Sequence, residues 1–99
     1  MLIQTPYNAG DVISFKLTSG EEIVAKFEEE NEKEFKVRNP LGMAMIGNGG
    51  YGLAPYMMTV DPKQSFTFRR DVIVVVNKTV DDTAKSYIEA TSGIQLGDA

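Results

Sequence analysis

Apolar and polar residues alternate near the N-terminal end of the chain. Over 13–17 every odd position is apolar and every even position is polar, which is the period-two pattern of a strand with one buried face. Turn-forming residues follow at 18–21, and over 22–28 the odd positions are apolar again. The sequence therefore predicts a strand over 11–17 and a hairpin to a second strand.

The polar stretch 28–34 predicts a second turn, after which alternation over 35–38 begins a third strand. Pro40 cannot donate a backbone hydrogen bond and predicts a bulge or a strand edge. The apolar residues of 41–46 can extend this strand. The glycine-rich segment 47–52 then predicts a loop.

The C-terminal part of the predicted sheet is more broken. Segment 53–60 is apolar, and its secondary structure is ambiguous. Residues 61–64 are of types that favour a turn. Residues 65–70 and 72–76 predict two strand segments. With five or six short strands in all, we expect a mostly β fold, a small, strongly bent antiparallel five-stranded barrel over about 11–76.

One helix is predicted, over about 80–92. Thr79 can act as its N-cap, with Asp82 at capping-box spacing, and Gly93 suits a glycine stop. Five residues fall on one face at helical spacing and predict packing on the barrel or on a neighbouring subunit: Val80, Ala84, Tyr87, Ile88 and Thr91.

The amino-acid composition excludes several classes of catalytic and metal-binding site. The 99 residues contain no cysteine and no histidine, which excludes disulfides, thiolate nucleophiles, histidine-containing triads and most transition-metal sites. We therefore expect a single domain over 1–99 that is not an enzyme and holds no metal and no cofactor. Without a basic start or a long apolar run, a signal peptide and a membrane role are not predicted, and a cytoplasmic location is expected.

Two segments match patterns of functional sites, and each also has a simpler structural interpretation. Gly47–Gly52 matches G-x-G-x-x-G, but a dinucleotide site needs a helix directly after it, and Pro55 lies in a strand-like run. A flexible loop is favoured. The acidic residues of 28–34 could bind a divalent cation or supply two carboxylates for glycoside chemistry, yet a solvated acidic turn is favoured.

Aromatic residues and arginines supply the remaining candidates. A stacking platform for bases or a soft protein-binding surface could form from four residues, although core or subunit packing is favoured: Tyr51, Tyr56, Met57 and Met58. Arg69 and Arg70 could bind phosphate or could equally form ion pairs with Asp71 or Asp61. Because the net charge is −4, any nucleic-acid contact has to be local.

Two stretches together resemble the Sm/LSm family of five-stranded barrels that assemble into RNA-binding rings. Val12–Phe27 is similar to the family's opening hairpin, and Phe68–Val75 is similar to its closing motif of an apolar residue, Arg, Gly, Asp or Asn, and β-branched residues. Further segments, at 53–57, 66–72 and 79–94, resemble small Sm-like proteins encoded by tailed phages, including those of marine cyanobacteria. The resemblance implies one Sm-like domain.

The resemblance also implies which residues would contact RNA. Arg69 matches the arginine that points into the pore of the family's rings, and Asn31 matches the asparagine of the loop between strands two and three. The uridine-stacking position falls on Glu29 or Glu30, neither of which is aromatic. Arg70 stands where the family has glycine.

We therefore expect a non-catalytic nucleic-acid-binding ring, for single-stranded RNA, with a role in RNA or DNA processing. The residues expected to contact nucleic acid are Arg69, Arg70, Asn31, Tyr51 and Tyr56. The alternative is a protein-interaction or phage structural module with the same barrel and no nucleic-acid binding, and an enzyme comes third. Self-assembly also follows from segment 72–76, an apolar strand that would be hazardous as an exposed edge. A phage-encoded chain would act in the host cytoplasm.

Overall fold

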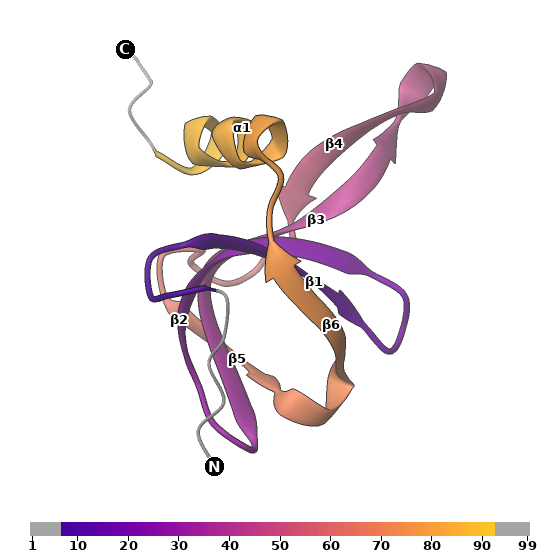
Figure 1. Ribbon diagram of the computed structural model, residues 1–99. Helices are drawn as coiled ribbons and strands as arrows, with labels where there is room; N and C mark the ends of the chain where they lie inside the picture. The colour runs from indigo at the N-terminus through magenta and orange to yellow at the C-terminus, as the bar shows by residue number, and fades with distance from the viewer. Residues whose placement is uncertain (1–6, 93–99) are drawn as a thin grey trace.

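The computed structural model describes residues 7–92, which form a mostly β structure with one C-terminal helix (Figure 1). The strands are β1 (Val12–Leu17), β2 (Glu22–Glu30), β3 (Glu34–Ile46), β4 (Gly50–Pro55), β5 (Ser65–Arg69) and β6 (Ile73–Lys78). Short 3-10 turns η1 (Gly47–Gly49) and η2 (Arg70–Val72) separate strands, and α1 spans Asp81–Thr91. Over the described residues no helix is long and apolar enough to cross a membrane.

All strand pairs are antiparallel, in the order β4-β3-β2-β1-β6, with β5 also paired to β3. The first half of β3 pairs with β5 through Glu34–Arg38, and its second half pairs with β4 through Leu41–Ile46. The sheet has six strands and is not closed, whereas a barrel of five was predicted. The additional strand is β4, whose first half lies in the segment predicted as a glycine-rich loop and whose second half lies in the ambiguous apolar segment 53–60.

The predicted irregularity at Pro40 is confirmed as a bulge. Val24 pairs with Leu41 and Lys26 with Arg38, so two residues of β3 face one residue of β2. Asn39 has a φ of 50°, in the left-handed region that asparagine tolerates better than most residues. The bulge marks the point where β3 exchanges its partner β5 for β4.

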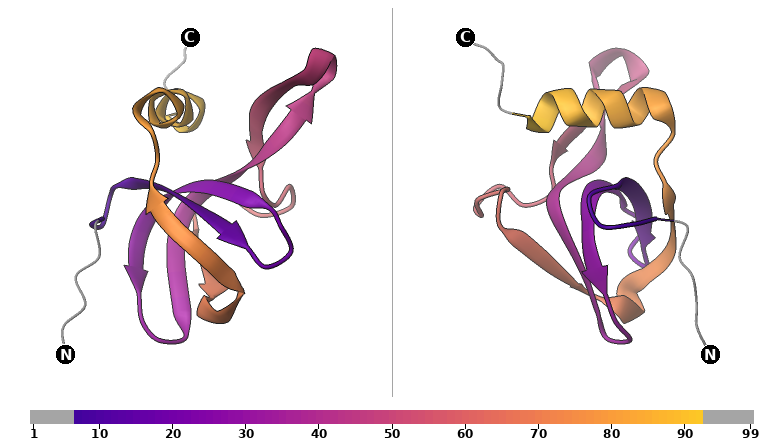
Figure 2. Two further views of the ribbon diagram at one scale, coloured as in Figure 1. Left: turned by 45° about the vertical axis from the view of Figure 1, so that its right-hand side comes forward. Right: turned by 60° about the vertical axis from the view of Figure 1, so that its left-hand side comes forward.

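Beyond the bulge, residues 41–55 form a hairpin that we call the arm. It projects from the sheet in every view (Figure 2). The predicted glycine-rich loop is shorter than expected: η1 makes the turn, with positive φ at Asn48 (71°) and Gly49 (78°), and β4 already begins at Gly50. A strand, and no helix, follows the G-x-G-x-x-G segment, so the arrangement that a dinucleotide site needs is absent here.

The core lies between five of the six strands. Its buried residues come from Tyr7 and from β1, β2, β3, β5 and β6, and none comes from β4. Phe15 stands at its centre, with its ring 5.2 Å from that of Phe35 and 5.1 Å from that of Phe68, both edge to face. The members are Tyr7, Ile13, Phe15, Leu17, Ile23, Ala25, Phe27, Phe35, Val37, Phe68 and Ile73.

Helix α1 packs on the outer face of the sheet and buries one of its described residues. Tyr87 is fully buried against Val24 and Leu41. Its hydroxyl donates to the backbone carbonyls of Arg38 (3.1 Å) and Asn39 (2.8 Å). The helix is therefore attached at the bulge, where the arm begins.

The expected cap of α1 was wrong. Thr79 does not cap the helix: Val80 occupies the N-cap position without a side-chain hydrogen bond, because the Thr79 hydroxyl is hydrogen-bonded to that of Ser14 (2.8 Å). Of the predicted apolar face, Tyr87 packs on the sheet, whereas Val80 and Ile88 are 70% and 51% exposed, so packing on a neighbouring subunit stays a prediction. The predicted glycine stop at residue 93 lies outside the described residues.

Candidate functional site

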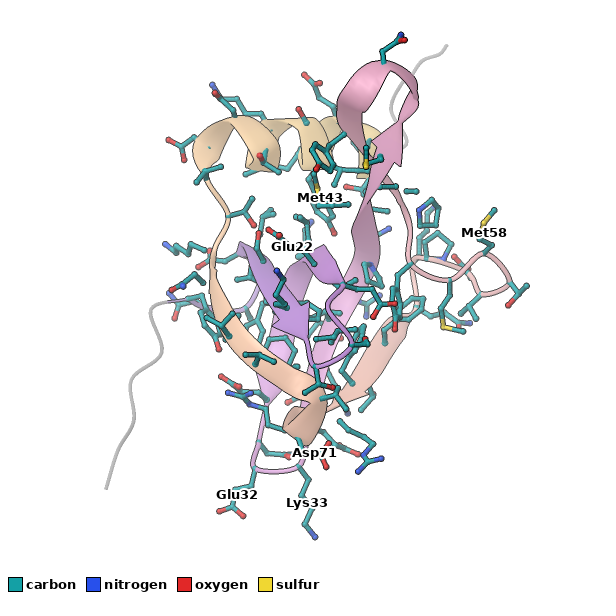
Figure 3. The ribbon with its side chains drawn as sticks, turned by 90° about the vertical axis from the view of Figure 1, so that its right-hand side faces the viewer. Glu22, Glu32, Lys33, Met43, Met58 and Asp71 are labelled. Carbon is teal, nitrogen blue, oxygen red and sulfur yellow. The ribbon has the colours of Figure 1, made fainter. Side chains whose placement is uncertain are left out.

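Three of the predicted nucleic-acid contacts lie at one end of the sheet. Asn31 is in the turn between β2 and β3, and Arg69 and Arg70 are at the junction of β5 with η2. The backbone amide of Arg70 donates to the carbonyl of Lys33 (2.8 Å), which ties the two segments together. Figure 3 shows this end at the bottom of the molecule, with Glu32, Lys33 and Asp71 labelled. We call it the turn end.

Asn31 shapes the turn itself. Its side-chain oxygen accepts hydrogen bonds from the backbone amides of Lys33 and Glu34, each at 2.8 Å. This is the Asx-turn geometry for which asparagine is favoured in tight turns. The side-chain carbonyl group of Asn31 is therefore engaged within the chain.

Arg70 is held between a carboxylate and an aromatic ring. Its Nε lies 3.1 Å from Glu30 Oε1, and its guanidinium lies 5.7 Å from the centre of the Phe35 ring. Glu30 also accepts a hydrogen bond from the Tyr7 hydroxyl (2.9 Å). Burial, together with this hydrogen bond, raises the pKa of Tyr7 to about 12. The Tyr7–Glu30–Arg70 contact gave no signal in the sequence, because its members are distant along the chain and their spacing matches no motif.

Arg69 is the accessible arginine of the pair. Its side chain is 79% exposed, and its Nη2 lies 2.8 Å from Asp71 Oδ2. The ion pair with Asp71 that we weighed against phosphate binding is therefore present. Exposed pairs of this kind contribute only about 0–1 kcal/mol, so a phosphate could replace the carboxylate.

Two further basic residues, on β3, are also paired, whereas Lys33 in the turn itself forms no ion pair with a described residue. Lys36 lies 3.5 Å from Glu29, and Arg38 pairs with Glu28. The hydrogen bond from Ser65 and the contact with Arg38 hold the pKa of Glu28 below its usual range. The acidic segment is thus partly neutralised by ion pairs, and within the described part of the chain no group of three or more carboxylates is placed to hold a metal ion.

The two predicted tyrosines do not join the arginines. Tyr51 lies on the arm and is 67% exposed. Tyr56 is half-buried and packs on the core, with its ring 5.5 Å from that of Phe68. Met58 points away from the molecule on the β4–β5 connection (Figure 3). The structure therefore separates the expected aromatic platform from the turn end.

Sequence reasoning missed a groove between the arm and α1. It has a volume of about 420 Å³. Its apolar wall is on the arm, and its other wall is on the helix. The lining residues are Met43, Tyr51, Gly52 and Leu53 from the arm and Asp82, Thr83, Ser86 and Ala90 from α1.

No protein-family model matches this chain, and no curated protein matches it. Any function has to follow from the contacts of its own residues.

Proposed function

We propose that this chain is a non-catalytic, self-assembling module of Sm-like type that acts through protein–protein contacts, as an interaction or phage structural component. One observation carries the proposal. Among the described residues, β5 pairs only with β3 and β6 pairs only with β1. β4, on the arm, also pairs only with β3. Each chain thus has three strands with a free edge, and two of them, β5 and β6, belong to the strands that form the core.

The free edge of β6 is apolar. Val74 and Val75 are 63% and 49% exposed, and an exposed apolar edge strand tends to pair with another chain. Pairing β6 of one copy with β5 of the next uses a different edge on each side. Such a head-to-tail contact closes into a ring when the rotation permits.

The Sm-like assignment is supported by the core. Five strands supply its residues, which is the strand number of the family's barrel, and the arm is then an addition outside that barrel. The segment that resembles the family's closing motif contains η2, which connects β5 to β6. These two features favour a five-stranded barrel whose open side lies between β5 and β6.

The test is an edge variant, Val74→Lys with Val75→Lys. Both side chains are exposed, so the fold should persist while the apolar edge becomes charged. We expect light scattering to give a mass above one chain for the native protein and the mass of one chain for the variant. Met58→Lys, at an exposed residue outside the edges, is the control. An assembly that is unchanged in the variant would contradict the use of this edge.

Single-stranded RNA binding is the second candidate, and it is favoured by Arg69. A ring would repeat this exposed arginine around one axis and create a positive potential that the net charge conceals. The paired carboxylates of the turn end oppose this, and for that reason we place it second.

Fluorescence anisotropy with a short oligouridine tests RNA binding. If Arg69 neutralises phosphates, affinity should fall as salt rises, and Arg69→Ala should reduce the salt slope by about one for each phosphate that is no longer neutralised. Lys85→Ala, on α1, is the control for a general decrease in positive charge. An assembled protein that shows no binding at low salt would exclude this candidate.

A further inference from the structure

The arm has one apolar face. Met43 pairs with Leu53 and Met45 pairs with Tyr51 across the hairpin, and cross-strand partners lie on the same face. Met45 and Tyr51 are 69% and 67% exposed. Met43, Tyr51 and Leu53 line the groove beside α1, and Figure 3 shows Met43 directed into the space below the helix.

Within one chain, the apolar face of the arm does not meet an apolar face of α1. The groove wall on α1 consists of Asp82, Thr83, Ser86 and Ala90, which is mostly polar. At 100° per residue, Ile88 lies on the opposite side of Tyr87 from Ser86, and Ala84 shares that side. With Val80 and Ile88 exposed, the apolar side of the helix faces away from the arm of its own chain.

Strand directions bring the two apolar surfaces together between copies. Arg38 of β3 pairs with Ser65 of β5, so the arm continues beyond the Ser65 end of β5. In β6 the chain leaves at Lys78 and enters α1. Antiparallel pairing of β5 with β6 of the next copy places the Ser65 end beside the Lys78 end. The arm of one copy and α1 of the next then leave the joined sheet at the same end, and both elements rise from that end in Figure 2.

Interface size gives a second reason for this contact. Strands β5 and β6 contain five and six residues. A stable specific interface uses about 20–30 residues on each side. Strand pairing alone falls short of that, and the arm and the helix are the adjacent apolar surfaces that can supply the remainder.

We propose that Met45 and Tyr51 on the arm of one copy pack against Val80 and Ile88 on α1 of the next copy. This second contact rests on the assembly proposed above. It gives each copy two arm–helix contacts, one through its arm and one through its helix. The occupant of the exposed side of α1 is therefore another copy of this chain.

Cross-linking tests the contact, because the native chain has no cysteine. The double variant Met45→Cys with Ile88→Cys, treated with a short bismaleimide, should give a ladder of covalent species larger than dimers. Each single-cysteine variant should give dimers at most. Met58→Cys with Ile88→Cys, a second exposed methionine paired with the same helix position, should give no ladder.

A charge variant gives an independent readout. Ile88→Glu should raise the concentration at which the assembly dissociates by about tenfold or more, as for removal of a central apolar side chain from an interface. Lys85→Glu, on the same helix, should leave it unchanged. A monomeric native protein would overturn the assembly and this contact together. A native assembly that gives no ladder and tolerates Ile88→Glu, or a cross-link formed only within one chain, would overturn this contact alone.

Discussion

Tyr87 is the residue on which the position of the helix depends. Its ring covers Val24 and Leu41, and its hydroxyl satisfies carbonyls at the bulge. It is the only fully buried residue of α1 within the described part of the chain. The helix, the bulge and the base of the arm are therefore coupled through one side chain.

Two substitutions separate the ring of Tyr87 from its hydroxyl. Tyr87→Phe should lower the free energy of unfolding by about 1–2 kcal/mol, because two part-buried backbone carbonyl groups lose their donor. Tyr87→Ala should lower it by about 3–5 kcal/mol, because the cavity adds to the reduced burial. Urea unfolding followed by circular dichroism measures both. Equal stability of Tyr87→Phe and the native protein would show that the hydroxyl is not needed.

The stability of the fold should decrease at alkaline pH because two of its tyrosines are buried. Burial raises the pKa of Tyr7 to about 12 and also raises that of Tyr87, whereas tyrosine in an unfolded chain titrates near about 10. The folded state then binds these protons more tightly, so their contribution to stability is complete below pH of about 10 and is lost as pH rises toward about 12.

The measurement is the urea midpoint between these two pH values. Tyr7→Phe should make the midpoint fall less steeply with pH, because the residue no longer has a proton to lose. Tyr51→Phe, at an exposed tyrosine, is the matched comparison. If Tyr7→Phe falls as steeply as the native protein, Tyr7 does not contribute to the alkaline loss.

At the scale of elements, the arm depends on its turn. Gly49 has a φ of 78°, and an added Cβ would meet no atom within 4 Å. Gly49→Ala should therefore cost about 1 kcal/mol through backbone strain alone. Hydrogen exchange of the arm amides should become faster while exchange in the core strands stays unchanged. Gly47→Ala has the same open surroundings without a positive φ and should leave exchange in the arm unchanged.

The elements that could be predicted from the sequence are those with local signals. Alternation marked β1 and β2, Pro40 marked the bulge, and the interruption near Arg70 marked η2. β4 was missed because its large residues, Tyr51 and Leu53, alternate with glycine and alanine and not with polar residues, and because glycines favour a loop. The capping role expected of Thr79 failed for a reason that is distant in sequence, since Ser14 competes for its hydroxyl.

In the candidate site too, features that depend on neighbouring residues could be predicted, whereas contacts between residues distant in the sequence could not. The sequence predicts Asn31 in a turn and the two arginines beside a break between two strands. In the structure both positions lie at one end of the sheet. The partners of the arginines were not predictable in full: Asp71 is adjacent, but Glu30 reaches Arg70 only through the folding of β2 against η2. The groove beside α1 arises from the projection of the arm, which has no sequence signature.

At the scale of the whole molecule, the chain has both unpaired strand edges and exposed apolar surfaces. Over residues 7–92, β4, β5 and β6 each have one unpaired edge. The arm and α1 expose apolar side chains at the end of the sheet opposite the turn end. The arginines at the turn end are mostly occupied by carboxylates. This distribution favours contacts with other copies over contacts with phosphate.

The most direct test of self-assembly is the solution mass of the native chain by light scattering over a wide range of concentrations. Head-to-tail pairing of β5 with β6 in a closed ring predicts one assembled species, whose mass is a whole multiple of 10.9 kDa and stops increasing once the ring is complete. A mass of one chain at all concentrations would contradict assembly, and an unlimited series of masses would contradict ring closure.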